Sequence, residues 1–228
     1  MERNEVIQGL LDMYSEPSYL EIGVCEGFTF HSLNAARKVA VDPAFRFNLE
    51  EAQADPANAN AAYHQVPSDD YFASQAGAND MFDVIFVDGL HTFDQTLRDL
   101  LNAIARLKPG GAIIVDDVRP SSYHASLPSM DEFFLVRAGL GDDYPAWMGD
   151  VYRLVFFIRD YLASFSYATV QENHGQTVLW RATRALTQQP ADVATVAAFE
   201  FKEVHLQSAA YNYQPFVDIK KRISEINK

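Results

Sequence analysis

The chain has 228 residues, 48% of them hydrophobic and 21% charged, which supports one globular domain with a full-sized core. Its formal net charge of −13 argues against nucleic acid and anionic membrane surfaces as partners, because binding phosphate needs a basic face. The single cysteine, Cys25, excludes an intrachain disulfide. The sequence has no signal-peptide pattern and no apolar run near the roughly 18 residues of a membrane span, so we expect a cytoplasmic protein.

In chain order, the first part of the sequence alternates between predicted helices and strands. A short amphipathic helix is expected at residues 6–14, and the predicted strands are residues 19–24, 39–41 and 63–66. A helix is expected at residues 29–37, and residues 48–62 form either a helix interrupted at Pro56 or a partly irregular crossover. This alternation predicts an α/β fold with a doubly wound, mostly parallel sheet.

Residues 82–118 form the clearest unit of the sequence. The apolar run at residues 83–87 is typical of a buried parallel strand and ends at Asp88. A predicted helix follows, stopped at residues 108–111, with an apolar stripe of Leu97, Leu100, Leu101, Ile104 and Leu107. A second apolar strand at residues 112–115 ends in Asp116 and Asp117. If the two strands are parallel neighbours, all three aspartates lie at the edge where open α/β sheets bind ligands.

Beyond residue 118 the pattern is looser. We expect a long irregular loop at residues 119–131, a helix at residues 150–161, and strands at residues 166–171 and 177–181 that form a β-hairpin. Tyr211, Tyr213 and Phe216 lie in a less regular tail, where they would cover the core or form a dimer contact.

A glycine loop follows the first predicted strand and spans Glu21 to Gly27. Its glycines, Gly23 and Gly27, have G-x-x-x-G spacing and not the G-x-G-x-x-G of dinucleotide-binding loops. Two carboxylates, Glu21 and Glu26, disfavour a pyrophosphate here and favour a cationic or zwitterionic ligand. The alternative is a tight turn without a ligand, and we expect Cys25 within the loop to be packed and inert.

Two further polar positions follow the next predicted strands. Asp42 lies roughly twenty residues beyond the glycine loop, where an acidic residue can bind both ribose hydroxyls, although Asp is also a frequent helix N-cap. Ser68 and Asp69 have a position suited to an adenine edge, and the alternative for them is ordinary turn chemistry.

The three aspartates at the sheet edge have the chemistry of a hard-cation site. Mg²⁺ prefers oxygen ligands, and three carboxylates so close together would repel one another without a cation. The alternative is that Asp88 contacts only a cofactor while Asp116 and Asp117 cap the next loop. His91 would stand beside this site as a general base, a substrate-orienting donor or a structural residue, and His124 is a weaker candidate. Other histidines, His174 included, we interpret as surface or structural.

The segments LEIGVCEG, AVDP, FDVIFVDG and LKPGGAIIVDDV, in this order, resemble the class I S-adenosylmethionine-dependent methyltransferases. VDGLHTFDQTLRDL with the later PGG and VDDV is most similar to the macrocin- and cephalosporin-type O-methyltransferases. The resemblance covers roughly residues 18–181. It implies a seven-stranded Rossmann-like sheet with an antiparallel C-terminal hairpin.

The resemblance also implies site residues. Cofactor-binding positions would be Glu21, Gly23, Val24, Gly27, Asp42, Ser68, Asp69 and Asp88. Asp88, Asp116 and Asp117 match the places that hold Mg²⁺ in related metal-dependent enzymes, and His91 and Asp88 would be the catalytic residues.

The expected reaction is methyl transfer from S-adenosylmethionine to a hydroxyl of a small molecule, of sugar or natural-product type, with magnesium assisting. We expect a methyltransferase domain at residues 1–187 and an appendage at residues 188–228 that packs on the domain or on the partner of a homodimer. Residues 119–149 and the tail would face the substrate. The competing hypotheses are a nicotinamide-dependent oxidoreductase, a catalytically silent cofactor-binding protein and an aminopropyltransferase.

Overall fold

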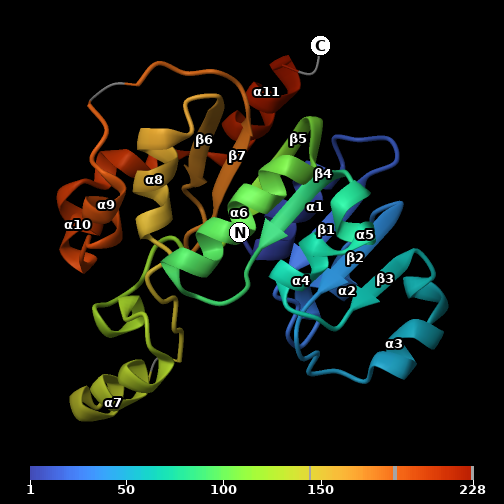
Figure 1. Ribbon diagram of the computed structural model, residues 1–228, viewed down its shortest axis with the longest axis horizontal. Helices are drawn as coiled ribbons and strands as arrows, with labels where there is room; N and C mark the ends of the chain where they lie inside the picture. The colour runs from blue at the N-terminus through green and yellow to red at the C-terminus, as the bar shows by residue number, and fades with distance from the viewer. Residues whose placement is uncertain (144, 187–188, 227–228) are drawn as a thin grey trace.

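A computed structural model describes residues 1–143, 145–186 and 189–226 of the chain. Within these residues the strands form one eight-stranded sheet in the order β3-β2-β1-β4-β5-β7-β6-β8 (Figure 1). The strands are β1 (Ser18–Ile22), β2 (Arg37–Val41), β3 (Ala61–His64), β4 (Phe82–Val87), β5 (Leu107–Val115), β6 (Phe165–Val170), β7 (Thr177–Arg181) and β8 (Tyr213–Gln214). Strands β1 to β5 are parallel, and β7 pairs antiparallel with both β5 and β6.

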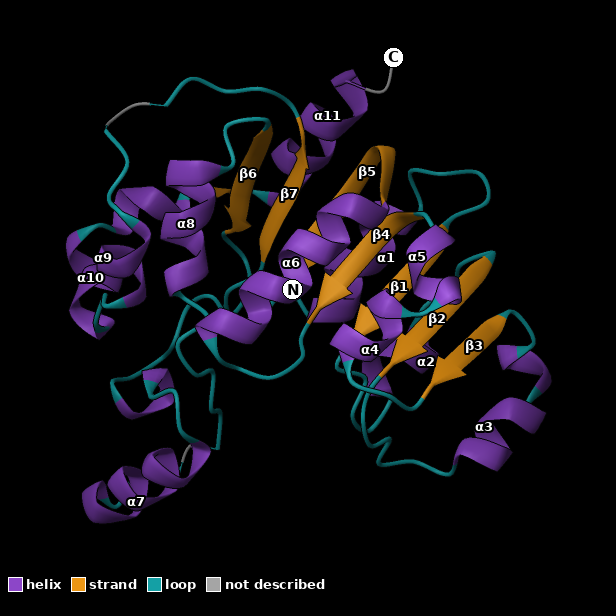
Figure 2. Ribbon diagram, in the orientation of Figure 1, coloured by secondary structure: helices purple, strands orange, loops and turns teal. Residues whose placement is uncertain are grey.

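Helices cover both faces of this sheet (Figure 2). They are α1 (Arg3–Leu11), α2 (Phe28–Ser32), α3 (Leu49–Ala54), α4 (Ser68–Ala73), α5 (Gln75–Asn79), α6 (Phe93–Arg106), α7 (Met130–Leu140), α8 (Arg153–Tyr161), α9 (Val193–Ala197), α10 (Phe201–Leu206) and α11 (Phe216–Ile226). Short 3₁₀ turns lie at Pro56–Asn58, His124–Ser126 and Ser208–Tyr211. None of the described helices has the length and apolar character that crossing a membrane requires.

Alternation along the strands divides the core into two layers. In β1, Leu20 belongs to the apolar cluster that includes residues of α6 and α8, whereas its neighbour Tyr19 belongs to the cluster with α1 and α11. Successive strand side chains point to opposite faces, so a strand buried on both faces reads as one apolar run. The expected doubly wound, mostly parallel fold with an antiparallel hairpin is confirmed.

The sheet has eight strands and not the expected seven. The additional strand, β8, lies in the C-terminal tail and pairs in parallel with β6. A strand of two residues has no hydrophobic periodicity, which explains why the sequence did not indicate it. Nearby, Tyr211 is buried and stacks on Tyr213 with ring centroids 5.4 Å apart, and Phe216 is buried, so these rings pack on the domain. The expected boundary at residues 187 and 188 falls on positions outside the described residues.

Several predicted element limits were wrong. The helix expected at residues 29–37 ends at Ser32, because β2 already begins at Arg37 and the chain must return extended to reach it. Strand β5 begins at Leu107, so the glycines expected to end the preceding helix lie within the strand. A Cβ on Gly111 would lie 2.7 Å from the Asp83 carbonyl oxygen, which shows how closely β5 passes β4 there.

Two features around α6 and α7 also differ from expectation. Leu101, placed on the apolar stripe of α6, is 46% exposed, because the buried positions follow the spacing of Phe93, Thr96, Leu100 and Ala103. The loop expected at residues 119–131 contains a 3₁₀ turn and leads into α7, which stands apart from the sheet in Figure 2.

Candidate functional site

The glycine loop after β1 has a backbone that other residues could not adopt without strain. Gly23 and Gly27 have φ angles of 86° and 78°, in the left-handed region. A Cβ on Gly23 would lie 1.9 Å from the Asp88 carbonyl oxygen. Gly27 is the N-cap of α2. The loop therefore depends on both glycines, which let its backbone pass close to Asp88 and to the His31 side chain.

Glu21 lies at the end of β1, buried beneath this loop. Its carboxylate accepts a hydrogen bond of 2.6 Å from the Tyr19 hydroxyl. Burial raises the pKa of Glu21 to about 8, against the hydrogen bond from Tyr19, which lowers it. A buried carboxyl with this pKa favours a cationic group nearby, because a positive charge stabilises the ionised form.

Asp42 and Ser68 line a cavity beside the glycine loop. The Asp42 carboxylate accepts hydrogen bonds from the backbone N–H groups of Cys25, at 2.8 Å, and Ala44, at 2.7 Å. Asp42 thus fixes the glycine loop in addition to facing the cavity. Ser68 donates to Asp99 at 2.6 Å, and Asp69 lies beside it on the cavity wall.

The three aspartates meet at the carboxyl ends of β4 and β5, as expected from the sequence. Asp116 and Asp117 are buried, and Asp117 has a left-handed backbone with φ of 57°. Burial, together with the charge of Asp116, raises the pKa of Asp117 to about 7, and the same causes raise the pKa of Asp88. Burial is the larger cause of both shifts, the negative charge of Asp116 adds to it, and the positive charges of His91 and Arg3 act against it.

Basic side chains surround these carboxylates, and two of them were missed in the sequence. Arg3, the first residue of α1, places one guanidinium nitrogen 2.7 Å from Asp88 Oδ2 and the other 3.2 Å from Asp116 Oδ2. His174 Nε2, from the β6–β7 turn, lies 3.0 Å from Asp116 Oδ1, a contact with the aspartate edge that the sequence did not indicate. Its hydrogen bond with Asp116 raises the pKa of His174.

His91 lies at the same edge, where the sequence placed it. Its Nε2 is 3.4 Å from Asp88 Oδ1 and 3.2 Å from Asp117 Oδ2, and its Nδ1 is 2.9 Å from the Trp147 carbonyl oxygen. Burial alone would lower the pKa of His91, but its contacts with the two carboxylates outweigh burial and raise the pKa to about 9. The two carboxylates therefore favour the protonated form of His91.

Two groups of side chains here have the donors for a metal ion. Asp88, His91 and Asp117 offer ligand atoms within 4.8 Å of one another, and so do Asp116, Asp117 and His174. Asp116 Oδ2 is buried and has no hydrogen bond among the described residues, and the Arg3 guanidinium 3.2 Å away is its ion-pair partner. An oxygen in that state, in a cluster of carboxylates, fits a hard cation.

One large cavity, of about 1120 Å³, is lined by the glycine loop and by Asp88, His91 and Asp117, but not by Asp116 or His174. One wall consists of the glycine loop with Glu21, Val24, Asp42, Ser68 and Asp69. The other wall contains Leu90, His91, Met130, Pro145, Ala146 and Trp147, and Glu2, Arg3 and Asn4 of the N-terminal segment also line the cavity. The cavity is therefore polar where the glycine loop lies and largely apolar opposite.

Three local expectations were wrong. Cys25 is exposed and lines the cavity, so it is not packed inside. His124 is buried away from the aspartate edge, with Nε2 3.0 Å from Asp142. Thr92 and Gln95 have the spacing of a capping box, which predicts a helix that begins at Thr92. Thr92 makes no side-chain cap for α6, where instead Asp150 accepts a hydrogen bond of 2.6 Å from the Phe93 N–H.

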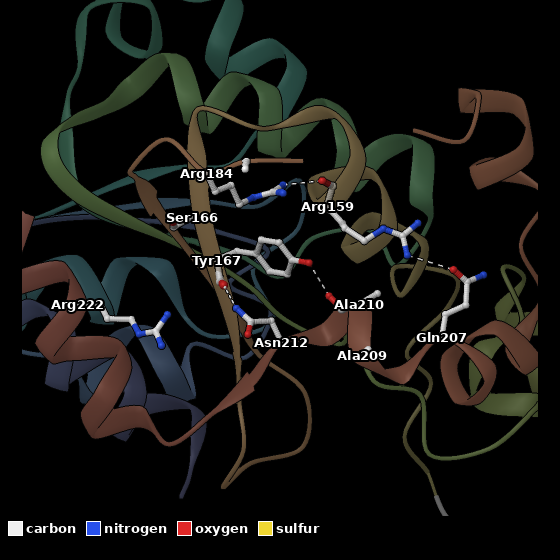
Figure 3. A pocket seen from close by; sticks show the side chains of 10 residues that line it. Arg159, Ser166, Tyr167, Arg184, Gln207, Ala209, Ala210, Asn212 and Arg222 are labelled. Carbon is white, nitrogen blue, oxygen red and sulfur yellow. Dashed lines mark hydrogen bonds between the residues drawn. The ribbon is translucent and has the colours of Figure 1, made fainter. Parts of the chain in front are cut away.

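A second cavity, of about 570 Å³, lies among β6, the segment after β7 and the C-terminal helices (Figure 3). Arg159, Arg184 and Arg222 line it. Arg184 donates to the carbonyl oxygens of Phe165, at 2.9 Å, and Arg159, at 2.7 Å, and Arg159 pairs with Asp160. These bonds hold the C-terminal end of α8 to its surroundings, which is a structural role.

Comparison with known proteins agrees with the geometry. Residues 20–118 match a family model described as a methyltransferase domain. No curated protein matches the sequence significantly.

Solved structures of O-methyltransferases share the fold. A candidate O-methyltransferase from Klebsiella pneumoniae is 18% identical with a TM-score of 0.55, over 80% of this chain and 82% of that one. TomG from Streptomyces achromogenes, an O-methyltransferase of tomaymycin synthesis solved with S-adenosylmethionine, is 17% identical with a TM-score of 0.52, over 79% of each chain. A candidate caffeoyl-CoA O-methyltransferase from Staphylococcus aureus is 15% identical with a TM-score of 0.54, over 80% and 85%.

The strand order defines a fold that the O-methyltransferase structures share. The glycine loop, Glu21 and Asp42 line a cavity that suits a zwitterionic nucleoside. The segment that matches the family model contains Glu21, the glycine loop and Asp42. Residues 20–118 match a methyltransferase domain, and the chain has the fold of S-adenosylmethionine-dependent O-methyltransferases of known structure.

Proposed function

We propose that this enzyme methylates a hydroxyl oxygen of a small molecule and that a divalent cation, Mg²⁺, assists. The observation that carries the proposal is the position of Asp88, Asp116 and Asp117, whose carboxylates converge at the sheet edge and whose members Asp88 and Asp117 line the cavity of the glycine loop. A hydroxyl is a weak nucleophile at neutral pH, and a cluster of this chemistry is suited to activating it.

Glu21, Gly23, Val24 and Gly27 would hold the amino-acid end of S-adenosylmethionine. The buried Glu21 carboxylate would face its ammonium group, and the left-handed glycines would let the ligand approach the backbone. Asp42 is placed for the ribose hydroxyls, with the adenine towards Ser68 and Asp69. The enzyme's contribution at this end is to orient the methyl group towards the second wall of the cavity.

Asp88, Asp116 and Asp117 would hold the cation. When bound, it would orient the acceptor oxygen and lower the pKa of the acceptor hydroxyl. The buried Asp116 Oδ2, which has an ion-pair contact with Arg3 but no hydrogen bond, supports this assignment.

His91 is the candidate proton acceptor, beside Asp88. The Trp147 carbonyl at 2.9 Å favours the tautomer with a proton on Nδ1, which leaves Nε2 directed at the carboxylates. Burial alone would lower the pKa of His91, the contacts with Asp88 and Asp117 raise it, and a cation bound to these carboxylates would lower it again. In its neutral form, Nε2 would accept the hydroxyl proton as the oxygen attacks the sulfonium methyl carbon. The C–O bond then forms, the C–S bond breaks and S-adenosylhomocysteine leaves.

The acceptor wall indicates which small molecules fit. Met130, Pro145, Ala146 and Trp147 give it an apolar character. An acceptor with an aromatic or apolar ring system suits this wall better than a bare sugar, because burying such a surface stabilises the complex. Within the sugar and natural-product classes, we propose a natural-product intermediate with a ring-borne hydroxyl.

The remaining expectations belong to the same proposal. The acidic charge of the chain supports a protein that binds neither nucleic acid nor membrane surfaces and works in the cytoplasm. We keep a methyltransferase domain at residues 1–187 with an appendage at residues 188–228, and a homodimer, as proposals that gel filtration and truncation can test.

The experiment uses S-adenosylmethionine labelled in its methyl group, with a panel of phenols, catechols, glycosides and matched amines. We expect label in hydroxyl acceptors, and a fall of about 100-fold with EDTA or in Asp116→Asn. The control, Asp94→Asn, removes an exposed aspartate of α6 and should transfer label at the wild-type rate. Transfer to amines alone would contradict O-methylation, and transfer unaffected by EDTA would contradict the role of the cation.

A further inference from the structure

Arg3 reaches the aspartate edge from the opposite end of the sequence. It is the first residue of α1, a helix anchored by the buried side chains of Val6, Ile7, Leu10 and Leu11. Its own side chain is 37% exposed. The packed part of the helix therefore fixes where Arg3 stands, while the guanidinium itself lies at the border between protein and cavity.

The guanidinium contacts one oxygen on each of two carboxylates. These are Asp88 Oδ2, at 2.7 Å, and Asp116 Oδ2, at 3.2 Å. The other oxygens of the two residues face His91, at 3.4 Å, and His174, at 3.0 Å. Each carboxylate oxygen that a metal ion could use on Asp88 or Asp116 therefore already has a basic side chain beside it. Of these basic side chains, Arg3 is the one at the end of a helix.

We propose that Arg3 and a divalent cation compete for the carboxylates of Asp88 and Asp116, so that binding of the cation releases Arg3. This proposal rests on the proposed function for the presence of the cation. A dication bound to Asp88 and Asp116 at metal–oxygen distances of about 2.1 Å would lie close to the Arg3 guanidinium, which contacts the same two carboxylates, and the like charges repel each other.

Release of Arg3 changes the wall of the cavity. Glu2, Arg3 and Asn4 all line it, and the N–H groups of Glu5 and Val6 bond to the Glu2 carbonyl oxygen. Without its ion pairs, the first turn of α1 has fewer contacts and frays more readily. The cation thus opens the N-terminal side of the cavity, which couples metal binding to the entry of the acceptor.

Binding of Mn²⁺, measured by electron paramagnetic resonance on the full chain, tests the competition. We expect Arg3→Gln to bind Mn²⁺ about tenfold more tightly than wild type, with Arg3→Lys in between, because one charge beside two carboxylates is removed. The matched control is Arg37→Gln, which removes an arginine–aspartate pair, Arg37 with Asp80, on β2. It should bind Mn²⁺ as wild type does.

Hydrogen exchange at the amides of Glu5 and Val6 tests the release. Mn²⁺ should speed their exchange in wild type, and exchange in Arg3→Gln should already be fast without the ion. Equal or weaker Mn²⁺ binding by Arg3→Gln would overturn the competition and leave the cation in place. If no variant bound Mn²⁺, both the competition and the cation of the proposed function would be overturned. Calorimetry with S-adenosylhomocysteine tests the methyl-donor site separately. Thermal unfolding curves establish that each variant is folded.

Discussion

The backbone of Gly23 in the loop after β1 passes the carbonyl oxygen of Asp88 at the end of β4 so closely that a Cβ would lie 1.9 Å from it. The two chain segments are neighbours because β1 and β4 pair in parallel, with Ile22 opposite Val87. Because of this close approach, the positions of the glycine loop and of the aspartate edge depend on each other. A change at either residue should therefore affect both.

Gly23→Ala should disturb both the glycine loop and the aspartate edge. The added methyl group collides with the Asp88 carbonyl, and the φ of 86° is strained for alanine, so we expect a loss of about 1–3 kcal/mol in the free energy of unfolding and at least about tenfold weaker binding of S-adenosylhomocysteine. Urea unfolding and calorimetry measure the two. Gly139→Ala is the control: nothing lies within 4 Å of its Cβ, and it should be neutral or stabilise α7. Equal unfolding free energies and equal affinities for S-adenosylhomocysteine in the two variants would refute the close approach of Gly23 to Asp88.

The buried Glu21 should make stability depend on pH. Its pKa is raised from 4.5 to about 8, so between these values the folded state keeps a proton that the unfolded state has lost. Stability contributed by this group is complete below pH 4.5 and falls as pH rises towards 8, by at most about 1.4 kcal/mol per pH unit. Glu21→Gln should flatten that part of the profile, whereas the exposed Glu225→Gln should not. An unchanged profile in Glu21→Gln would show that Glu21 is ionised in the unliganded protein.

The N-terminus of α6 offers a test of which residue caps it. Asp150 accepts from the Phe93 N–H and pairs with Arg153, so Asp150→Ala should cost about 1–3 kcal/mol of unfolding free energy. Thr92→Ala should stay within about 0.5 kcal/mol, since Thr92 makes no cap bond. Denaturant unfolding compares the two. The reverse ranking would mean that the helix begins as its sequence suggests.

Much of the fold could be predicted because its signals are local. The apolar runs of β1 and β4 and the turn between β6 and β7 each lie within a few residues, and the structure contains all of them. The two-residue β8 depends on pairing with β6, which is distant in sequence. The early start of β5 depends on the close approach of Gly111 to Asp83. Tertiary contacts set these limits, and a sequence window does not contain them.

The site divides in the same way. Asp88, Asp116 and Asp117 each follow a strand, so the edge of a parallel sheet predicts their meeting. Arg3 and His174 reach the same carboxylates from α1 and from the hairpin turn, and neither has a motif around it. From the sequence we expected a metal ion to offset the repulsion among the three aspartates. In the structure, the basic side chains of Arg3 and His174 offset part of that repulsion.

Binding of S-adenosylhomocysteine to the wild-type protein, measured by calorimetry with NAD as the control, tests the central claim most directly. The account predicts saturable binding at one site per chain, weakened in Asp42→Asn, with no heat from NAD. Binding of NAD in its place, or no binding of either ligand to protein shown to be folded, would contradict the methyltransferase assignment.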